Sequence, residues 1–343
     1  MWWAESKSII HRYQSGFRPA RGTIDCLAAL ATQAHNAYRR GQYLFCVFFD
    51  LEKAYDTCWK RLILSQLHKY GLRGELPRYI EDFLSNRTFR VKVGQSLSEE
   101  YEQKMGVPQG GVLSCTLFNI AINSVAEVIQ GLVNFSLYVD DKRISFPAVN
   151  YKTGVTRIQL VLNQLVKWSL RTGFRFSTEK TEWMVFHRRL PITEPIQFTM
   201  DGVTLKEVEE KRFLGLWHDR RLQWIKHVSK LRNSCNKSLN IIKIISRNNE
   251  ETDTKTLLRI YRAIVRSNLD YGCQVYGTAP KSYLVPLDPI HHKGLRICLG
   301  AYRTSPIESL YTEAVEPELK LRREMLQMQY YVRTLQFLPH NKP

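Results

Sequence analysis

The sequence predicts a mixed α/β region up to about residue 218, followed by a basic, all-helical region. In the first region, short apolar runs typical of strands alternate with helical spacing, and Asp201–Gly202 between two such runs is a strong hairpin signal. From Leu222 onward, apolar residues recur only at helical spacing. Because 343 residues exceed the usual size of one domain, we expect two or three subdomains.

The first predicted strand is the run 43–49, which is short, apolar and rich in aromatic residues, and which ends at Asp50. Helical spacing follows over 59–70. A second helix is expected from a cap at Ser114 to Gly131.

A β-hairpin is expected from the short runs 135–139 and 144–146. Asp140 and Asp141 lie near its tip, and Asp tolerates the positive φ of a tight turn. The remaining predicted elements are a helix over 155–172, paired strands at 174–176 and 183–186 around Lys180, a hairpin over 196–205, a strand over 212–217, and helices over 222–242, 254–269, 287–299 and 317–337.

The charge is strongly positive. There are 50 Lys and Arg against 32 Asp and Glu, a formal net charge of +18, while the 44% hydrophobic content excludes wholesale disorder. Residues 1–145 hold 18 basic and 14 acidic residues, so most of the excess lies further along the chain. Such an excess indicates a polyanionic partner, with nucleic acid as the first candidate and a merely basic soluble protein as the alternative.

The seven cysteines are scattered and none forms a CxxC pair, which argues against a disulfide framework or a zinc finger. The N-terminal residues lack the apolar core of a secretory signal, and the longest purely apolar run, 44–49, is too short to span a bilayer. We therefore expect an intracellular protein, in the nucleus, the cytoplasm or both, that is not secreted and has no membrane partner.

Three features carry the chemistry. Asp50 follows a buried strand, Asp140 and Asp141 are adjacent at a hairpin tip, and the Gly/Pro loop 106–111 lies between them. Adjacent carboxylates repel each other, and a bound divalent metal is the usual compensation. Two Mg²⁺ ions about 4 Å apart can clamp the attacking and leaving oxygens of a phosphoryl displacement. A solvated Asp-Asp turn is the alternative, which the two neighbouring motifs disfavour.

These motifs resemble the reverse transcriptase domain of non-LTR (LINE-type) retrotransposons, especially the jockey-like elements of arthropods. The similarity covers nearly the whole chain. The matching runs are QSGFRPARGTIDCL (14–27), FFDLEKAYD (48–56), GVPQGGVLSCTLFNIAIN (106–123), LYVDD (137–141), GFRFSTEKTEWMVF (173–186) and RFLGLWHD (212–219), with weaker similarity through 261–272, 294–306 and 319–324.

The resemblance implies a right-hand polymerase fold. Partial fingers would occupy 1–42, and the palm 43–218 with a fingers insertion at about 71–105. A helical thumb would occupy 219–275, and a helical connection region 276–343. The implied activity is RNA-directed DNA polymerisation with two Mg²⁺ ions, for which Mn²⁺ is a possible substitute. The implied partners are an RNA template, a DNA primer, their hybrid and dNTPs.

The resemblance also assigns roles to single residues. Asp50 and Asp140 would be the main metal ligands, with Asp141 in support. The other implied roles are a backbone metal ligand at Leu51, a steric gate against the ribose 2′-hydroxyl at Tyr55, nucleotide contacts at Gln109 and Gly110, a lysine near the triphosphate at Lys180, template or triphosphate contacts at Arg18 and Arg21, and a primer grip at Phe213, Leu214 and Gly215.

Two departures from the family pattern keep an alternative open. Lys142 and Arg143 replace the apolar residues that normally follow the aspartates, and both could neutralise or displace metal. Only 13 residues precede Gln14, so we expect an N-terminally truncated chain that associates with missing endonuclease or fingers segments. The alternative function is a catalytically silent fragment that binds RNA or a hybrid. Tyr55 and the RFLG run argue against an RNA-dependent RNA polymerase, and the overall similarity argues against an intron maturase.

Overall fold

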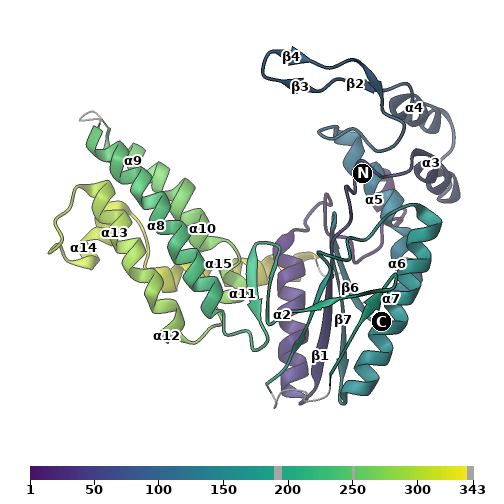
Figure 1. Cartoon of the computed structure of the whole chain (residues 1–343). Helices are drawn as coiled ribbons and strands as arrows, with labels where there is room; N and C mark the ends of the chain where they lie inside the picture. The colour runs from purple at the N-terminus through teal and green to yellow at the C-terminus, as the bar shows by residue number, and fades with distance from the viewer. Residues whose placement is uncertain (189–194, 249–251, 338–343) are drawn as a thin grey trace. The chain divides into compact units, whose positions relative to one another are not determined.

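The computed structural model describes residues 1–188, 195–248 and 252–337 (Figure 1). The chain divides into two compact units, Met1–Glu209 and Glu210–Pro343. The first is a mixed helix and sheet unit, and the second is a hairpin followed by helices. We describe each unit by itself.

A five-stranded sheet lies at the centre of the first unit. Its order is β11-β8-β1-β7-β6, so strands far apart in sequence are neighbours. The central strand β1 pairs antiparallel with both β7 and β8, whereas β11 pairs parallel with β8. The strands are β1 (Tyr43–Phe49), β6 (Asn134–Tyr138), β7 (Asp141–Ala148), β8 (Glu182–Phe186) and β11 (Lys206–Glu207).

Two helices cover opposite faces of this sheet: α2 (Thr23–Arg39) lies on one side and α7 (Tyr151–Thr172) on the other (Figure 1). Because side chains alternate along a strand, β1 serves both faces and six of its seven residues are buried. Phe45 faces α7, where the absence of a side chain at Gly154 lets the helix approach the ring. The predicted strand at 43–49, the 135–146 hairpin and the helix over 155–172 are confirmed.

The other helices of the first unit enclose the end of the sheet that carries Asp50. The stretch Val112–Ile129 is apolar and long enough to cross a membrane by composition, but it is mostly buried here, as is usual for core helices. These elements are α1 (Trp2–Ser6), α3 (Lys60–Lys69), α4 (Glu75–Leu84), α5 (Val112–Ile122) and α6 (Ser124–Ile129).

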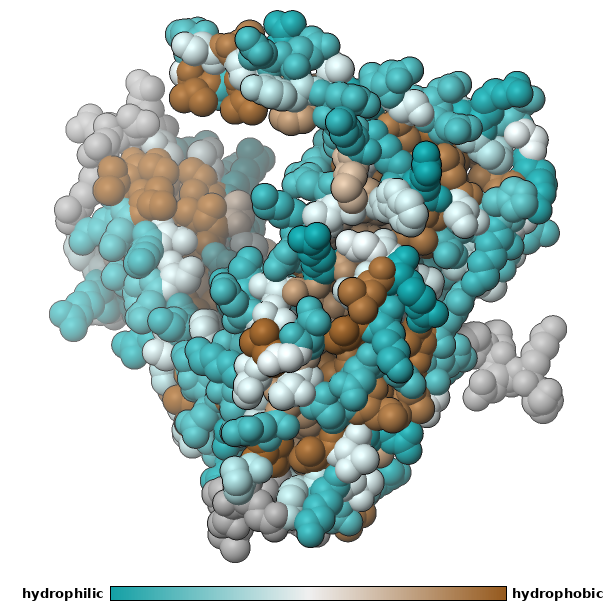
Figure 2. All heavy atoms as spheres, turned by 45° about the vertical axis from the view of Figure 1, so that its right-hand side comes forward, coloured by the Kyte–Doolittle hydropathy of each residue, from teal (hydrophilic) through white to brown (hydrophobic). Residues whose placement is uncertain are grey.

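Short strand pairs complete the first unit. β2 (Thr88–Phe89) pairs with β5 (Tyr101–Glu102), β3 (Lys92–Val93) with β4 (Ser96–Leu97), and β9 (Thr199–Met200) with β10 (Val203–Thr204). The last pair confirms the predicted hairpin around Asp201–Gly202. Figure 2 shows hydrophobic atoms exposed on the arm formed by β2–β5, which include the side chains of Phe89, Val91, Val93, Leu97 and Tyr101.

Two local expectations in this unit were wrong. The helix after the Gly/Pro loop begins at Val112 with Gly111 as its N-cap, so Ser114 lies inside the first turn and caps nothing. The strand β8 pairs with β1 rather than with 174–176, because Phe176 instead bridges to Leu51. The second error arose because local spacing says nothing about which segment a strand pairs with in the fold.

The second unit begins with a hairpin of β12 (Glu210–Phe213) and β13 (Leu216–Asp219). A single strand over 212–217 was predicted, and this was wrong. Leu214 and Gly215 both have positive φ, at +45° and +87°, and form a two-residue turn. Because Phe213 and Leu214 have apolar side chains, the sequence pattern resembled a strand and did not indicate this turn.

Helices form the rest of the second unit. The predicted long helix is α8 (Ile225–Asn248), whose inward face includes Val228, Leu231 and Cys235. The predicted helix over 254–269 is α9 (Thr254–Tyr261), which continues through one π-helical turn (Arg262–Arg266) into α10 (Ser267–Asp270). The remaining helices are α11 (Cys273–Tyr276), α12 (Lys281–Leu284), a 3-10 turn (Val285–Leu287), α13 (Asp288–Leu299), α14 (Ile307–Ala314) and α15 (Leu319–Phe337).

Candidate active site

The predicted carboxylates lie at one end of the central sheet. The β6–β7 hairpin closes with the pair Tyr138–Asp141, so Val139 and Asp140 form a two-residue turn. In the neighbouring pair of strands Phe49 lies opposite Lys142, and this register places Asp50 beside Asp141. Asp140 and Asp141 are exposed. The three aspartates therefore lie on backbone segments at the same edge of the sheet, where β1 ends and β7 begins.

The hairpin turn is strained at Val139. This residue has φ +60° and is 8% exposed, whereas the expected left-handed residue was an aspartate. A β-branched side chain in the left-handed region is an unusual conformation that costs about 1–3 kcal/mol. It persists only where surrounding contacts hold it.

Lys142 is buried beneath the same turn, and its Nζ donates to the backbone carbonyl of Asp140 at 3.0 Å. Burial lowers the pKa of Lys142 to about 7, while the negative charges of Asp140, Asp141 and Asp50 oppose that shift. Its ammonium group therefore lies within electrostatic reach of all three carboxylates.

Arg143 is on the opposite face of the sheet, toward α2. Its Nη1 donates to Gln33 Oε1 and to Ser145 Oγ, both at 2.9 Å, and the residue is fully buried. Lys142 and Arg143, which both depart from the family pattern, therefore lie on opposite faces of the sheet. Of the two, only Lys142 is near the carboxylates.

The segment that carries Lys180 runs beside Asp50. Ser177 N donates to the Asp50 carbonyl at 2.9 Å, and Glu52 N donates to the Arg175 carbonyl at 3.0 Å. These bonds place Lys180 Nζ 3.3 Å from Asp50 Oδ2, in an exposed ion pair. Leu51, between the two bonded residues, is buried.

The Gly/Pro loop 106–111 lies against the segment that follows Asp50. Gly106 N donates to the Cys58 carbonyl at 2.8 Å, and Val107 N donates to the Tyr55 carbonyl at 3.0 Å. Gln109 Nε2 donates to Asp56 Oδ1 at 2.9 Å. At Gly110, φ is +86°, so a glycine is favoured by backbone conformation.

The ring of Tyr55 stacks on Phe118, with 4.6 Å between ring centroids. Burial raises the pKa of Tyr55, and the neighbouring Cys115 and the charge of Asp140 raise it further. The hydroxyl therefore lies close enough to Asp140 to feel its charge. The candidate residues of the first unit therefore belong to one region of it. They are Asp50, Asp140, Asp141, Lys180, Tyr55 and Gln109.

The family model described as reverse transcriptase (RNA-dependent DNA polymerase) matches residues 2–218. The chain belongs to this family.

Curated relatives of this chain include mobile-element proteins of Drosophila melanogaster. The RNA-directed DNA polymerase from mobile element jockey is 26% identical over 87% of this chain and 33% of the relative. The probable RNA-directed DNA polymerase from transposon X-element is 24% identical over 86% of this chain and 33% of the relative. The chain thus spans about a third of the length of these relatives. Among solved structures, apo telomerase from Candida tropicalis is 12% identical, with a TM-score of 0.49, over 99% of this chain and 58% of that one.

The donor set at this edge of the sheet fits hard divalent cations, because Asp50, Asp140 and Asp141 offer carboxylate oxygens of the kind that Mg²⁺ prefers. Among residues 1–188, 195–248 and 252–337, no three His, Cys, Asp or Glu side chains are already gathered as a metal cluster. Because burial lowers the pKa of Lys142 to about 7, its amine is protonated in only part of the molecules near pH 7, and its Nζ donates to the Asp140 backbone carbonyl. A metal would therefore be repelled by Lys142 only in its protonated form.

The two arginines expected near template or triphosphate make contacts within the N-terminal segment of the chain. Arg18 forms a two-pronged ion pair with Glu5 at 2.6 Å and also donates to the carbonyls of His11 and Gln14. Arg21 donates to the Arg12 carbonyl. These contacts give both side chains a structural role, and their contact with substrate stays a prediction.

The residues expected to form a primer grip belong to the second unit. Phe213 and Leu214 are buried, Gly215 is exposed, and Tyr271 Oη donates to the Leu214 carbonyl at 2.8 Å. This bond fixes the β12–β13 turn to the helical part of its own unit. Their contact with a primer stays a prediction.

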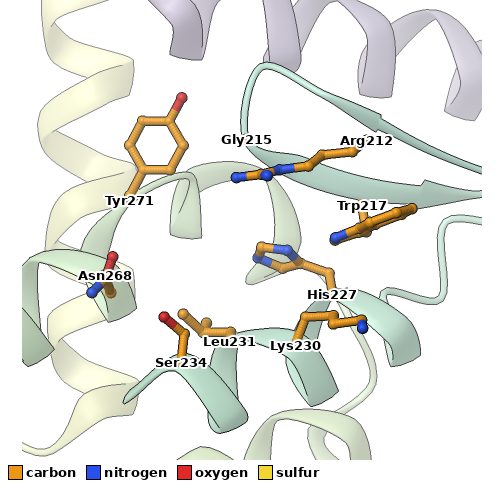
Figure 3. A pocket seen from close by; sticks show the side chains of 9 residues that line it. All are labelled: Arg212, Gly215, Trp217, His227, Lys230, Leu231, Ser234, Asn268 and Tyr271. Atoms are coloured by element: carbon orange, nitrogen blue, oxygen red, sulfur yellow. The ribbon is translucent and has the colours of Figure 1, made fainter. Parts of the chain in front are cut away.

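Beside this turn the second unit has a cavity of about 430 Å³. His227, which is 93% buried, extends into it from α8, and Nε2 of its ring has no hydrogen-bond partner (Figure 3). Burial and the charge of Arg212 lower the pKa of His227 to about 4, so this imidazole is neutral at pH 7. The lining includes two cations and no acidic residue: Arg212, Gly215, Trp217, His227, Lys230, Leu231, Ser234, Asn268 and Tyr271.

Sequence reasoning missed the residues that support the β6–β7 hairpin. Gln14 and Asn119 are both buried and contact the turn or the segment beside it. Both fall inside recognised runs, QSGFR and GVLSCTLFN, so position within a motif was the available signal. Nothing in the spacing indicated which element each would touch.

Proposed function

We propose that this chain is the polymerase part of a non-LTR retrotransposon protein, a nucleotidyltransferase that extends a DNA 3′-hydroxyl on an RNA template. The observation that carries the proposal is the meeting of Asp50 with Asp140 and Asp141 at one end of the β1–β7 pair. Family membership over residues 2–218 supports the reaction class. The length of the jockey-like relatives makes a longer polyprotein the natural setting, with association with endonuclease or fingers segments.

The proposed architecture is a right hand. The palm is 43–218 with its insertion at about 71–105, preceded by partial fingers at 1–42. The thumb is 219–275, followed by the connection region 276–343. The five-stranded sheet supports a palm, and the helices after the β12–β13 hairpin support a thumb.

In the proposed mechanism Asp50 and Asp140 would hold two Mg²⁺ ions, for which Mn²⁺ could substitute, with Asp141 and the Leu51 carbonyl in support. When bound, such ions would supply charge stabilisation for the attacking and leaving oxygens. Lys180, paired with Asp50 when no substrate is present, exchanges that partner for the incoming triphosphate and donates a proton to the leaving pyrophosphate. Gln109 and Gly110 contact the incoming nucleotide, and Tyr55 closes the side where a 2′-hydroxyl would lie.

The second unit is proposed to hold the hybrid. Phosphate contacts do not depend on base sequence, so exposed cations along a strand path suffice for binding. Arg212 and Lys230 beside the Leu214–Gly215 turn are placed for such contacts, and the neutral His227 offers a further polar atom in the cavity (Figure 3). We propose that the protein works inside the cell, in the nucleus, the cytoplasm or both.

Primer extension tests this function. Purified chain would receive an RNA template, an annealed DNA primer, Mg²⁺ and dNTPs. We expect extension by the wild-type chain and a loss of about 10²-fold or more in Asp140→Asn, because this change removes charge from the proposed metal site. Asp201→Asn, at the exposed turn of the β9–β10 hairpin, is the matched control and should extend normally.

A second function is favoured by one observation, the burial of Lys142 beneath the turn that carries Asp140, where its Nζ donates to the Asp140 carbonyl. In that case the chain binds RNA or hybrid without polymerising. Wild-type protein that binds the hybrid in a salt-sensitive manner but adds no nucleotide, with either Mg²⁺ or Mn²⁺, would support this function and exclude the polymerase.

A further inference from the structure

Residues 13–15, where the QSGFR run begins, form an additional edge of the sheet. Leu137 N donates to the Tyr13 carbonyl and Ser15 N donates to the Leu137 carbonyl, both at 2.9 Å, so residue 14 bridges to β6 in parallel. Gln14 is 1% exposed. Its side chain is therefore fixed directly beside the strand that leads into the catalytic turn.

The amide oxygen of Gln14 accepts two backbone hydrogen bonds. One comes from Gly16 N at 2.8 Å and the other from Val139 N at 3.2 Å. Two N–H donors on the same atom settle which end of the amide is the oxygen. The second bond connects this side chain to the first residue of the two-residue turn that presents Asp140.

Gly16 packs against Val139 in the same turn. A Cβ built at this position would lie 2.5 Å from Val139 Cγ2 and 2.7 Å from Val139 N, so only glycine fits. Asn119 Nδ2 donates to the Gly16 carbonyl at 2.8 Å and holds the segment in place from α5. The strained Val139 is thus enclosed by contacts from Gln14 and Gly16.

We propose that Gln14 is a positioning residue for catalysis: it holds Val139 in the left-handed conformation and thereby orients Asp140 toward Asp50. This inference rests on the proposed polymerase function. A buried acceptor for the Val139 N–H is what keeps a β-branched residue in a conformation that it otherwise avoids. Without it, the turn relaxes toward other conformations and the carboxylates lose their arrangement.

The test replaces Gln14 by Leu, which keeps the volume but removes the acceptor. We expect kcat for primer extension to fall by about 10- to 100-fold, because small misplacements of catalytic groups have effects of this size, while hybrid affinity stays within about twofold. Gln14→Glu keeps an acceptor oxygen at the same place and should retain most of the wild-type kcat.

Asn123→Leu is the matched control. Asn123 is also buried and also anchors the N-terminal segment, since it accepts from His11 N at 2.7 Å and donates to the Ile9 carbonyl at 2.8 Å, but it does not bond to the turn. If anchoring alone matters, this variant will lose kcat as Gln14→Leu does, and the proposal is overturned. The unfolding free energies of both variants are measured in urea, and kcat is compared once these free energies are known to agree.

A double-mutant cycle with Val139→Gly isolates the positioning effect. Glycine adopts positive φ without strain, so Gln14→Leu should cost less than about threefold in kcat when residue 139 is glycine. Equal losses in both backgrounds would contradict the proposal.

Amide hydrogen exchange gives a readout that needs no activity. Exchange at residues 139–141 should accelerate at least about tenfold in Gln14→Leu and stay unchanged in Asn123→Leu. Unchanged exchange in Gln14→Leu would overturn the proposal even if the polymerase were active. If exchange accelerates but the chain extends no primer, the proposed polymerase function is wrong while the account of the hairpin holds.

Discussion

Tyr55 has two interpretations at the scale of the single residue. Its ring stacks on Phe118 as a core aromatic would, yet its hydroxyl lies within reach of the charge of Asp140. A purely structural tyrosine needs only the first contact. A steric gate needs both, since the ring must be rigid and must lie where the sugar of the incoming nucleotide enters.

Substitution of Tyr55 by Val distinguishes these interpretations. The smaller side chain opens the space for a 2′-hydroxyl, so we expect the ratio of kcat/KM for dNTP over rNTP to fall by about 10- to 100-fold. The measurement is single-nucleotide extension with each substrate. Tyr101→Val, on the exposed β5 strand, is the control and should leave selectivity unchanged.

If Tyr55→Val loses stability but keeps its preference for dNTP, the ring is a core residue and the gate lies elsewhere. The unfolding free energy of the same protein, measured in urea, tells the two outcomes apart.

At the scale of elements, a buried histidine connects the helices of the second unit. Pro317 O can only accept, so His291 Nε2 carries the proton and donates to it at 3.1 Å. Nδ1 is then left to accept from Tyr261 Oη at 2.6 Å. This bond joins α9 to α13 and requires a neutral imidazole.

Acid should therefore weaken the second unit through His291. Burial lowers the pKa of His291 to about 3, well below its ordinary value of 6.5. Below pH 6.5 the unfolded chain binds a proton that the folded chain does not, so the unfolding free energy falls as pH falls. The expected contribution is up to about 1.4 kcal/mol per pH unit between about pH 6 and pH 3.

Urea unfolding between pH 7 and pH 5 checks this slope in wild type and in His291→Gln. The variant should be less stable at pH 7, because it loses a buried hydrogen bond. Its unfolding free energy should, however, depend less on pH than that of the wild type. The same slope in both proteins would show that other groups control the acid sensitivity.

Local patterns predicted elements well and their partners poorly. The apolar run 43–49 could only be a buried strand, and Asp201–Gly202 could only be a turn. By contrast, the turn at Leu214–Gly215 puts a large apolar residue at positive φ, which no propensity favours. Likewise the enclosure of Lys142 depends on a register between strands about ninety residues apart, which is a property of the assembled sheet.

At the scale of the whole molecule, the positive excess would control the proposed binding of nucleic acid. The residues beyond 145 carry most of it, and Arg212 and Lys230 concentrate charge around one cavity of the second unit. Counterions released from phosphates make such binding weaken as salt rises.

The double substitution Arg212→Ala and Lys230→Ala should reduce the slope of log affinity against log salt concentration by about 1 to 2 for an RNA–DNA hybrid. Fluorescence anisotropy over a range of KCl concentrations measures it. Lys293→Ala with Arg303→Ala removes the same charge from exposed positions outside the cavity, and should change the slope less. Equal effects of the two pairs would show that the cavity has no special part in binding.

The bridge between residue 14 and β6 has a consequence for aggregation. β6 is an outer strand of the sheet, and the backbone around Leu137 is paired on its open side by residues 13–15. Unpaired strand edges are templates for pairing between separate molecules. A polypeptide that began after Gly16 would therefore uncover this edge, and its copies would be prone to join through β6, so poor solubility of a shortened chain would follow from backbone exposure rather than from a damaged core.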